Sequence, residues 1–192
     1  MYISMPDSQT HKNALATVTQ WIETVVIGLN LCPFAGPVVR KGGLNLQVWD
    51  GRDLNNLVED VTLALSGLAA AGPDHTSIIV LTEALADFSD YNDFLGILDA
   101  LIEDMGLSGV IQIASFHPDY CFAEHAPDDV ANYTNRAPYP LIHLLREDDV
   151  SHAVENVTDT LQIPIRNVTL MRELGHEHML KLLAACRQDL MP

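Results

Sequence analysis

Segments with helical periodicity alternate with short strand-like runs along this chain, and this order limits the folds that it can adopt. Four runs have the apolar or alternating pattern of strands: residues 44–49, 77–83, 109–116 and 141–145. Apolar stripes at helical spacing lie before, between and after them, over residues 13–30, 53–68, 89–105, 148–157 and 167–190. Strands that alternate with helices predict one layered α/β domain. A doubly wound sheet and a ferredoxin-like α+β sandwich both fit this order.

Several helix ends are marked by residues with known terminal preferences. Pro33 is expected to end the first helix, because the residue before a proline is pushed out of the helical conformation. Asp53 and Ser89 are predicted to cap the second and third helices, and Gly106 to end the third. A break near Gly175 is expected to divide the closing helical region.

Length and composition indicate one ordinary globular domain. A chain of 192 residues, 48% of them hydrophobic, can bury a normal core without metal or disulfide staples. We expect a tail over residues 1–12 and a single α/β domain over residues 13–192. The sequence has neither the pattern of a signal peptide nor a run of the roughly 20 apolar residues that span a membrane. Its three cysteines form no CxxC pair, which fits a reducing compartment, so we expect a cytoplasmic protein.

The charge distribution argues against two classes of partner. The net charge is −16, and between Arg52 and Arg136 the sequence has fifteen Asp and Glu but no Lys or Arg. Such a surface repels phosphate groups, so we expect neither nucleic acid nor an anionic membrane as a partner. A saline habitat would explain the same composition equally well.

The segment between the third and fourth predicted strands is the most unusual part of the sequence. Residues 115–140 contain two histidines, one cysteine, four prolines and five aromatic residues. Long irregular segments in compact domains are usually either functional or disordered, and this one is too aromatic for disorder. We therefore expect it to form most of a site.

Two histidines at the ends of this segment are candidate metal ligands or acid–base groups. His117 follows the third strand, and His143 lies in the fourth, on the face of Leu141 and Leu145. If these strands are neighbours, the two imidazoles could share a divalent transition metal or a proton. The side chains considered for a third ligand are Asp119, Tyr120, Cys121, His125, Asp128 and Asp129. Alternatively, His117 caps a turn and His143 is a hydrogen-bonded core histidine.

A thiol and a guanidinium are the other candidates. Cys32, just past a helix end, is a nucleophile if a neighbouring cation lowers its pKa, and packing otherwise. Arg136, with Asn132 and Asn135, could bind an anionic small molecule through its planar fork. It could equally pair with nearby aspartates, Asp128 among them, and hold the loop in shape.

Four stretches together resemble one known family, bacterial proteins of about this length called DUF1415. They are VIGLNLCPFA (26–35), QIASFHPDYCFA (112–123), NYTNRAPYPLIHLLRE (132–147) and IPIRN (163–167). The resemblance implies special roles for a set of matching residues: Cys32, Pro33, His117, Pro118, Tyr120, Asn132, Asn135, Arg136, Pro138, Pro140, His143 and Arg146. Ala137 departs from the serine usual after the arginine, so a hydroxyl there is not essential. The family supplies no reaction.

These observations predict a small-molecule enzyme whose site lies between NLCPF, FHPDY and TNRAPYPLIH. The candidate catalytic residues are Cys32, His117, Tyr120 and His143, with His117 and His143 as candidate metal ligands. Asn132, Asn135 and Arg136 are the candidate substrate-binding residues. A non-catalytic module that binds a metal or small ligand, and a partner-binding protein with an architectural loop, are the alternatives. Glycine-rich and GxSxG motifs are absent from the sequence, so nucleotide-binding and serine-hydrolase functions have no support.

Overall fold

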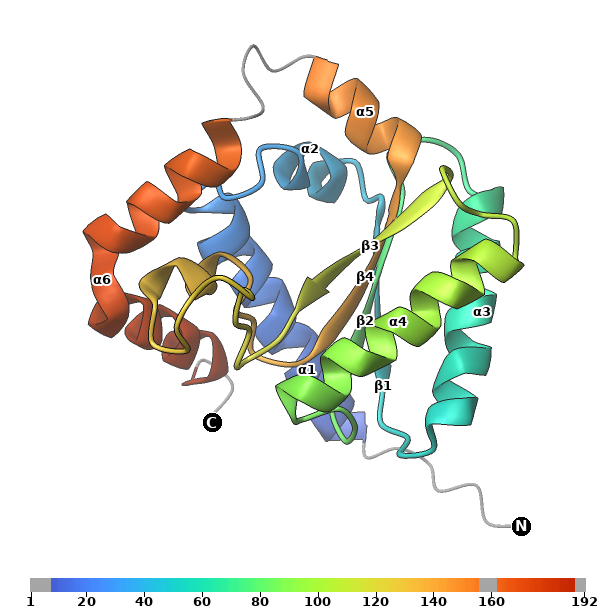
Figure 1. The fold of residues 1–192 in the computed structure, drawn as a ribbon, viewed down its shortest axis with the longest axis horizontal. Coiled ribbons are helices and arrows are strands. Elements are labelled where there is room, and N and C mark those ends of the chain that lie inside the picture. The colour runs from blue at the N-terminus through green and yellow to red at the C-terminus, as the bar shows by residue number, and fades with distance from the viewer. Residues whose placement is uncertain (1–7, 156–161, 189–192) are drawn as a thin grey trace.

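A mixed sheet lies between two layers of helices in the computed structural model, which describes residues 8–155 and 162–188 (Figure 1). Within these residues the strand order is β1-β2-β4-β3. The first strand, β1 (Leu44–Trp49), runs parallel to β2 (Thr76–Leu81). The central strand β4 (Leu141–Arg146) is antiparallel to both β2 and β3 (Ile111–Phe116). The predicted single layered domain is therefore confirmed, and the mixed sheet makes it α+β.

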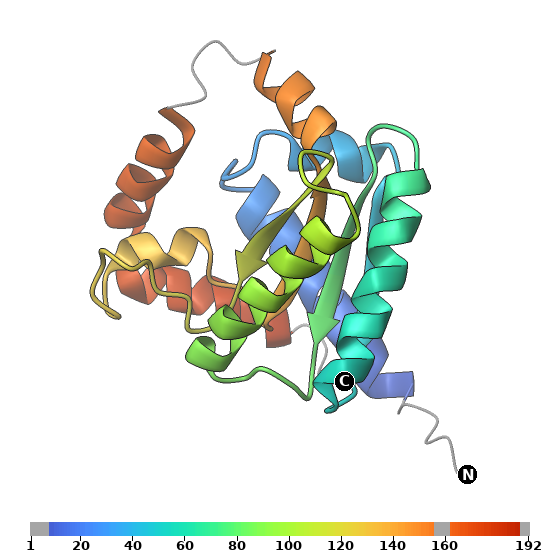
Figure 2. The ribbon, with the colours of Figure 1, turned by 45° about the vertical axis from the view of Figure 1, so that its right-hand side comes forward.

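Helices α3 (Leu54–Ala70) and α4 (Phe88–Asp104) cover one face of the sheet, and Figure 2 shows both from the side. Successive residues of a strand point to opposite faces, so every second residue of β2 and β4 faces these helices. Their shared core consists mainly of strand and helix residues at these positions: Leu57, Val61, Leu65, Ile79, Leu81, Phe94, Leu98, Ile142 and Leu144. We refer to this face as the α3/α4 face.

The opposite face, called the α1 face below, is covered by helices from both ends of the chain. Helix α1 (Ser8–Trp21) continues as the π-helix η1 (Ile22–Ile27) and packs beside α6 (Gln162–Gln188). The short 3-10 helix η2 (Val130–Thr134) contacts α6. The core on this face contains residues from the helices and from the other strand positions: Val18, Trp21, Val25, Ile78, Val80, Tyr133, Leu141, Met171 and Met179.

The first predicted helix differs from the structure at its start. Helix α1 begins at Ser8, inside the expected tail, rather than at residue 13. Residues 1–7 lie outside the described part, as do the predicted helix ends at residues 157 and 190. In the described part of the chain, no helix has both the length and the apolar character needed to cross a membrane.

The predicted cap of the second helix is confirmed, and that of the third is wrong by two residues. Asp53 accepts a hydrogen bond from the backbone N–H of Asn55 at 3.0 Å. The third helix is capped by Asp87, which accepts from the N–H groups of Ser89 and Asp90. Ser89 instead lies in the first turn of α4, where the Asp87 carboxylate satisfies its N–H group.

Two glycines act as the sequence predicts. Gly106 follows α4 with a φ of +68°, and Gly175 interrupts α6 with a φ of +78°. These left-handed conformations are accessible to glycine at little cost. Pro164 lies in the first turn of α6, where a missing N–H group is tolerated.

Candidate functional site

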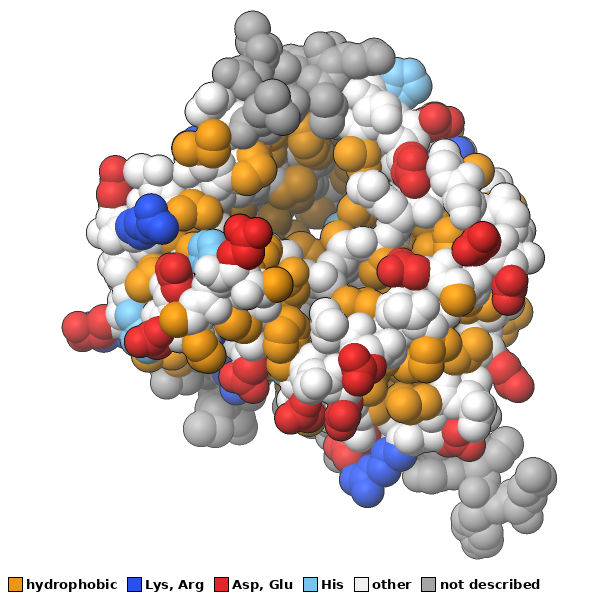
Figure 3. All heavy atoms as spheres, viewed as in Figure 1, with side chains coloured by type: hydrophobic (Ala, Val, Ile, Leu, Met, Phe, Trp, Pro, Cys, Tyr) orange, Lys and Arg blue, Asp and Glu red, His pale blue; other side chains and the backbone are white. Residues whose placement is uncertain are grey.

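A cavity of about 670 Å³ opens on the α1 face of the sheet, and we call it the main cavity. Its floor is the sheet, and its walls come from the end of α1, η1, the turn after Leu31, α2 (Ala35–Arg40) and α5 (Glu147–Glu155). Figure 3 shows a hollow with mostly hydrophobic walls in this part of the surface. The lining residues used below are Trp21, Cys32, Thr76, Ala114, Phe116 and His143.

A smaller cavity of about 450 Å³, the side cavity, adjoins the main cavity. Both cavities are lined by Val26, Cys32 and Phe116, so these residues form the boundary between them. The side cavity extends toward α6 and toward residues 115–140, called the long segment below. Asn135 and Phe122 of this segment line the side cavity. The volume of each cavity lies in the range of about 300–1,000 Å³ that is typical of small-molecule sites.

His143 lies on the floor of the main cavity, in the central strand. It pairs with Ile78 of β2 and Ala114 of β3, so its imidazole emerges from the middle of the α1 face. Thr76 Oγ1 lies 2.7 Å from His143 Nε2 and donates its own hydrogen to the Leu144 carbonyl oxygen at 2.8 Å. A hydroxyl has one hydrogen and a carbonyl only accepts, so Nε2–H must donate to Thr76. The lone pair of the neutral ring is therefore on Nδ1.

Nδ1 of His143 is open to the main cavity. Within the described residues this nitrogen has no hydrogen-bond partner, and it is not enclosed by protein atoms. Burial lowers the pKa of His143 to about 4, because the protonated ring would lose its hydration. The imidazole is consequently neutral near pH 7 and presents a hydrogen-bond acceptor to the cavity.

Cys32 lies at the boundary between the two cavities, in the turn that follows η1. Asn30, with a φ of +53°, ends the helical segment, and Asn167 Nδ2 donates to the Leu31 carbonyl at 2.7 Å. The thiol is partly exposed and forms no disulfide. Two of the predicted site residues, Cys32 and His143, thus line the same cavity.

His117 does not belong to this cavity. It lies on the α4 side, where its ring packs against Tyr91 at 5.1 Å and Phe88 at 5.3 Å between centroids. Its Nε2–H donates to the Leu85 carbonyl at 3.1 Å, and its Nδ1 accepts from the Asp119 N–H at 3.0 Å. Burial lowers its pKa. Leu85 has a left-handed φ of +54°, so this histidine holds a strained turn in place.

The two histidines are not brought together, although their strands are neighbours as the metal hypothesis required. Ala114 is the partner of His143, so the α1 face of β3 carries Gln112, Ala114 and Phe116. His117 directly follows Phe116, so its side chain points to the opposite face of the sheet. Both of its ring nitrogens already have partners. In the described residues, no group of three or more His, Cys, Asp or Glu side chains could hold a metal ion.

Asn132 and Arg136 hold the long segment in shape. Asn132 is fully buried, accepts from the Phe122 N–H at 3.1 Å and donates to the Ala126 carbonyl at 2.9 Å. The Arg136 guanidinium donates to the carbonyls of Tyr120 and Pro127 at 3.2 and 2.7 Å. It also lies over the Tyr133 ring, 4.7 Å from its centroid. The partners of Arg136 are therefore carbonyl groups and a ring rather than the aspartates considered from sequence.

The remaining predicted residues lie around this segment. Tyr120 packs against Phe88 and Phe122, with ring centroids 5.2 and 4.9 Å apart, and does not line the main or the side cavity. Asn135 lines the side cavity and donates to the Ser115 carbonyl at 3.1 Å. Of the three residues proposed to bind substrate, Asn135 alone lines either cavity.

Two residues of the main cavity were missed from sequence. Thr76 fixes the His143 ring, and its polar side chain at the start of a mainly apolar strand was the available indication. Trp21 is 2% exposed, and its Nε1–H has no hydrogen-bond partner in the described structure. In the sequence Trp21 is one residue of the apolar stripe over residues 13–30, and a sequence pattern does not show an unpaired indole.

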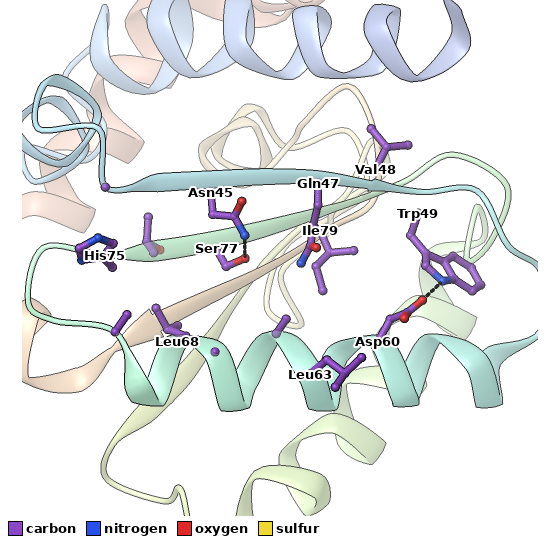
Figure 4. A pocket seen from close by; sticks show the side chains of 15 residues that line it. Asn45, Gln47, Val48, Trp49, Asp60, Leu63, Leu68, His75, Ser77 and Ile79 are labelled. Atoms are coloured by element: carbon purple, nitrogen blue, oxygen red, sulfur yellow. Dashed lines mark hydrogen bonds between the residues drawn. The ribbon is translucent and has the colours of Figure 1, made fainter. Parts of the chain in front are cut away.

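A third cavity, of about 570 Å³, lies between β1 and α3, on the other side of the sheet (Figure 4). Its polar side chains pair partly with each other: Asn45 donates to Ser77 at 3.2 Å, and Trp49 donates to Asp60 at 2.9 Å. It contains none of the site residues predicted from sequence. The main cavity is therefore the better candidate site.

Comparison with known proteins gives a family but no activity. The model of the DUF1415 family, described as proteins of unknown function, matches residues 13–181. This range includes Cys32, Asn135 and His143, the predicted site residues that line the two cavities. No curated protein and no solved structure matches this chain. The match extends over most of the sequence, so the chain belongs to the DUF1415 family.

Proposed function

We propose that this protein binds a small organic molecule in the main cavity, in contact with His143. The observation that carries the proposal is the neutral imidazole, whose Nδ1 opens without a protein partner into a largely apolar cavity of about 670 Å³. Volumes of about 300–1,000 Å³ with a few fixed polar groups are typical of small-molecule sites.

A second polar group of the cavity wall is unpaired but enclosed. The Trp21 indole is buried in the cavity wall with an unpaired N–H group, and an unpaired buried donor costs about 1–3 kcal/mol. Because this nitrogen is enclosed by protein atoms, the proposal rests on Nδ1 of His143, which is open to the cavity.

Binding can be tested with Nile red, an uncharged dye whose fluorescence rises in apolar surroundings. We expect it to bind the wild-type protein and to lose its site in Ala114→Trp, because Ala114 lines the floor beside His143. Ile97→Trp is the control, since Ile97 is 54% exposed on α4. Equal fluorescence from both variants, each folded by circular dichroism, would refute binding in the main cavity.

Catalysis is the second candidate function, favoured by the presence of Cys32 and His143 on the same cavity. A thiol beside a basic group is the usual arrangement of a cysteine nucleophile. However, a ring with a pKa of about 4 is a weak base near pH 7, so ligand binding has the stronger support. If His143 does activate Cys32, alkylation of Cys32 by iodoacetamide should slow in His143→Leu. An unchanged rate would remove this candidate.

A further inference from the structure

The charged side chains that line the main cavity already have partners in the protein. Arg146 donates to the carbonyls of Leu68 and Ala71, both at 3.0 Å, and so caps the end of α3. Its Nε also lies 3.6 Å from Asp149. Asp74 pairs with Lys41 at 2.6 Å. These bonds leave the cavity without an uncommitted charge among the described Lys, Arg, Asp and Glu residues.

An ionic ligand would therefore lose hydration without gaining a counter-ion. Transferring an unpaired charge from water to apolar surroundings is strongly unfavourable. The expected anionic ligand also loses its main support, because Arg136 is engaged within the long segment. An uncharged ligand needs neither a counter-ion in the cavity nor the Arg136 guanidinium.

The polar atom on the cavity floor specifies the complementary group. Because Thr76 keeps the hydrogen of His143 on Nε2, Nδ1 can only accept. A ligand with an O–H or N–H group would satisfy it, whereas an ether or a carbonyl in the same place would leave two acceptors facing each other. The wall around this atom is apolar, and Phe116 packs beside the ring with centroids 6.2 Å apart.

From these observations we infer that the ligand is an uncharged, largely apolar molecule that donates a hydroxyl or N–H hydrogen bond to Nδ1 of His143. The inference rests on the proposed function and adds the chemical class of the ligand. The adjoining side cavity, lined mainly by apolar side chains, gives room for an extended hydrocarbon part.

A matched series of four compounds tests this class at pH 7 by displacement of Nile red. The compounds are 4-propylphenol, its methyl ether 4-propylanisole, the anion 4-propylbenzoate and the cation 4-propylbenzylamine. We expect the phenol to bind about five- to tenfold more tightly than the ether, as one hydrogen bond predicts. The two ions should bind more weakly than the ether.

Two variants connect the preference to His143. In His143→Leu the phenol and the ether should bind equally, because the acceptor is gone. In Thr76→Val the advantage of the phenol should shrink, since the ring is no longer held in one tautomer. Equal binding of phenol and ether to the wild type, a preference that persists in His143→Leu, or tighter binding of either ion would overturn the inference. These results would leave the proposed function standing if Nile red binds, whereas absence of Nile red binding would refute the proposed function itself.

Discussion

Replacing His143 should make the stability of this protein less sensitive to acid. Burial holds the pKa of the folded-state imidazole at about 4, against an ordinary value near 6.5. Between these values the unfolded chain binds more protons than the folded one, so the free energy of unfolding falls as the pH is lowered. The contribution of this group is fully present above about pH 6.5 and is lost as the pH falls toward 4.

The size of the effect follows from the pKa difference. Each pH unit in this window is worth about 1.4 kcal/mol, so lowering the pH from 7 to 5 should cost about 2 kcal/mol through His143. This is an upper limit, because the ring is only half-buried and lines the main cavity, where solvent screens its charge.

The assay is urea unfolding at pH 7 and pH 5, followed by circular dichroism. We compare the wild type with His143→Leu, and with His178→Gln as a control at an exposed histidine. The acid-induced loss of stability should be smaller in His143→Leu than in the other two proteins, by up to about 2 kcal/mol. If all three lose the same free energy of unfolding, His143 does not titrate in this way.

Three further predictions concern side chains that hold the frame of the site. Asn132→Leu leaves the Phe122 N–H and the Ala126 carbonyl unpaired and should cost about 2–4 kcal/mol, measured by urea unfolding. Arg136→Lys replaces a fork that spans two carbonyls and should cost about 1–2 kcal/mol, with unchanged affinity for Nile red. Arg146→Met uncovers carbonyls at the end of α3 and should lower the free energy of unfolding by about 1–2 kcal/mol.

Controls make these three outcomes decisive. Asn92→Leu, at an exposed position of α4, should leave stability almost unchanged and serves as the control for Asn132. If the Arg136→Lys protein is still stable but binds Nile red more weakly, Arg136 contributes to ligand binding. A stable Arg146→Met protein would show that water replaces the guanidinium at the helix end.

Much of the fold was predictable because the information is local. Strand β1 was predicted with its observed bounds, and the cap at Asp53 and the helix stops at Gly106 and Gly175 depend on neighbouring residues alone. The third helix cap was misplaced because Asp87 and Ser89 are both good caps. Which of the two caps the helix depends on where the preceding chain turns, and the local sequence pattern does not determine this.

The candidate site was predictable only in part. Cys32 and His143 were identified from sequence and line one cavity. Asn132 and Arg136 looked like ligand groups, since amide and guanidinium side chains serve equally well for substrates and for loop carbonyls. Whether such a group faces a cavity or its own backbone depends on the path of the whole segment.

The sequence by itself determined the order of elements and which residues of each strand share a face, because both follow from local periodicity. It placed His143 with Leu141 and Leu145 correctly. Only the tertiary structure decided that β4 lies between β2 and β3, which puts His143 at the centre of the sheet beneath the main cavity. Strand neighbours are chosen by contacts far apart in the chain. For this reason His117, across the sheet from His143, could not be assigned to its side before the pairing was known.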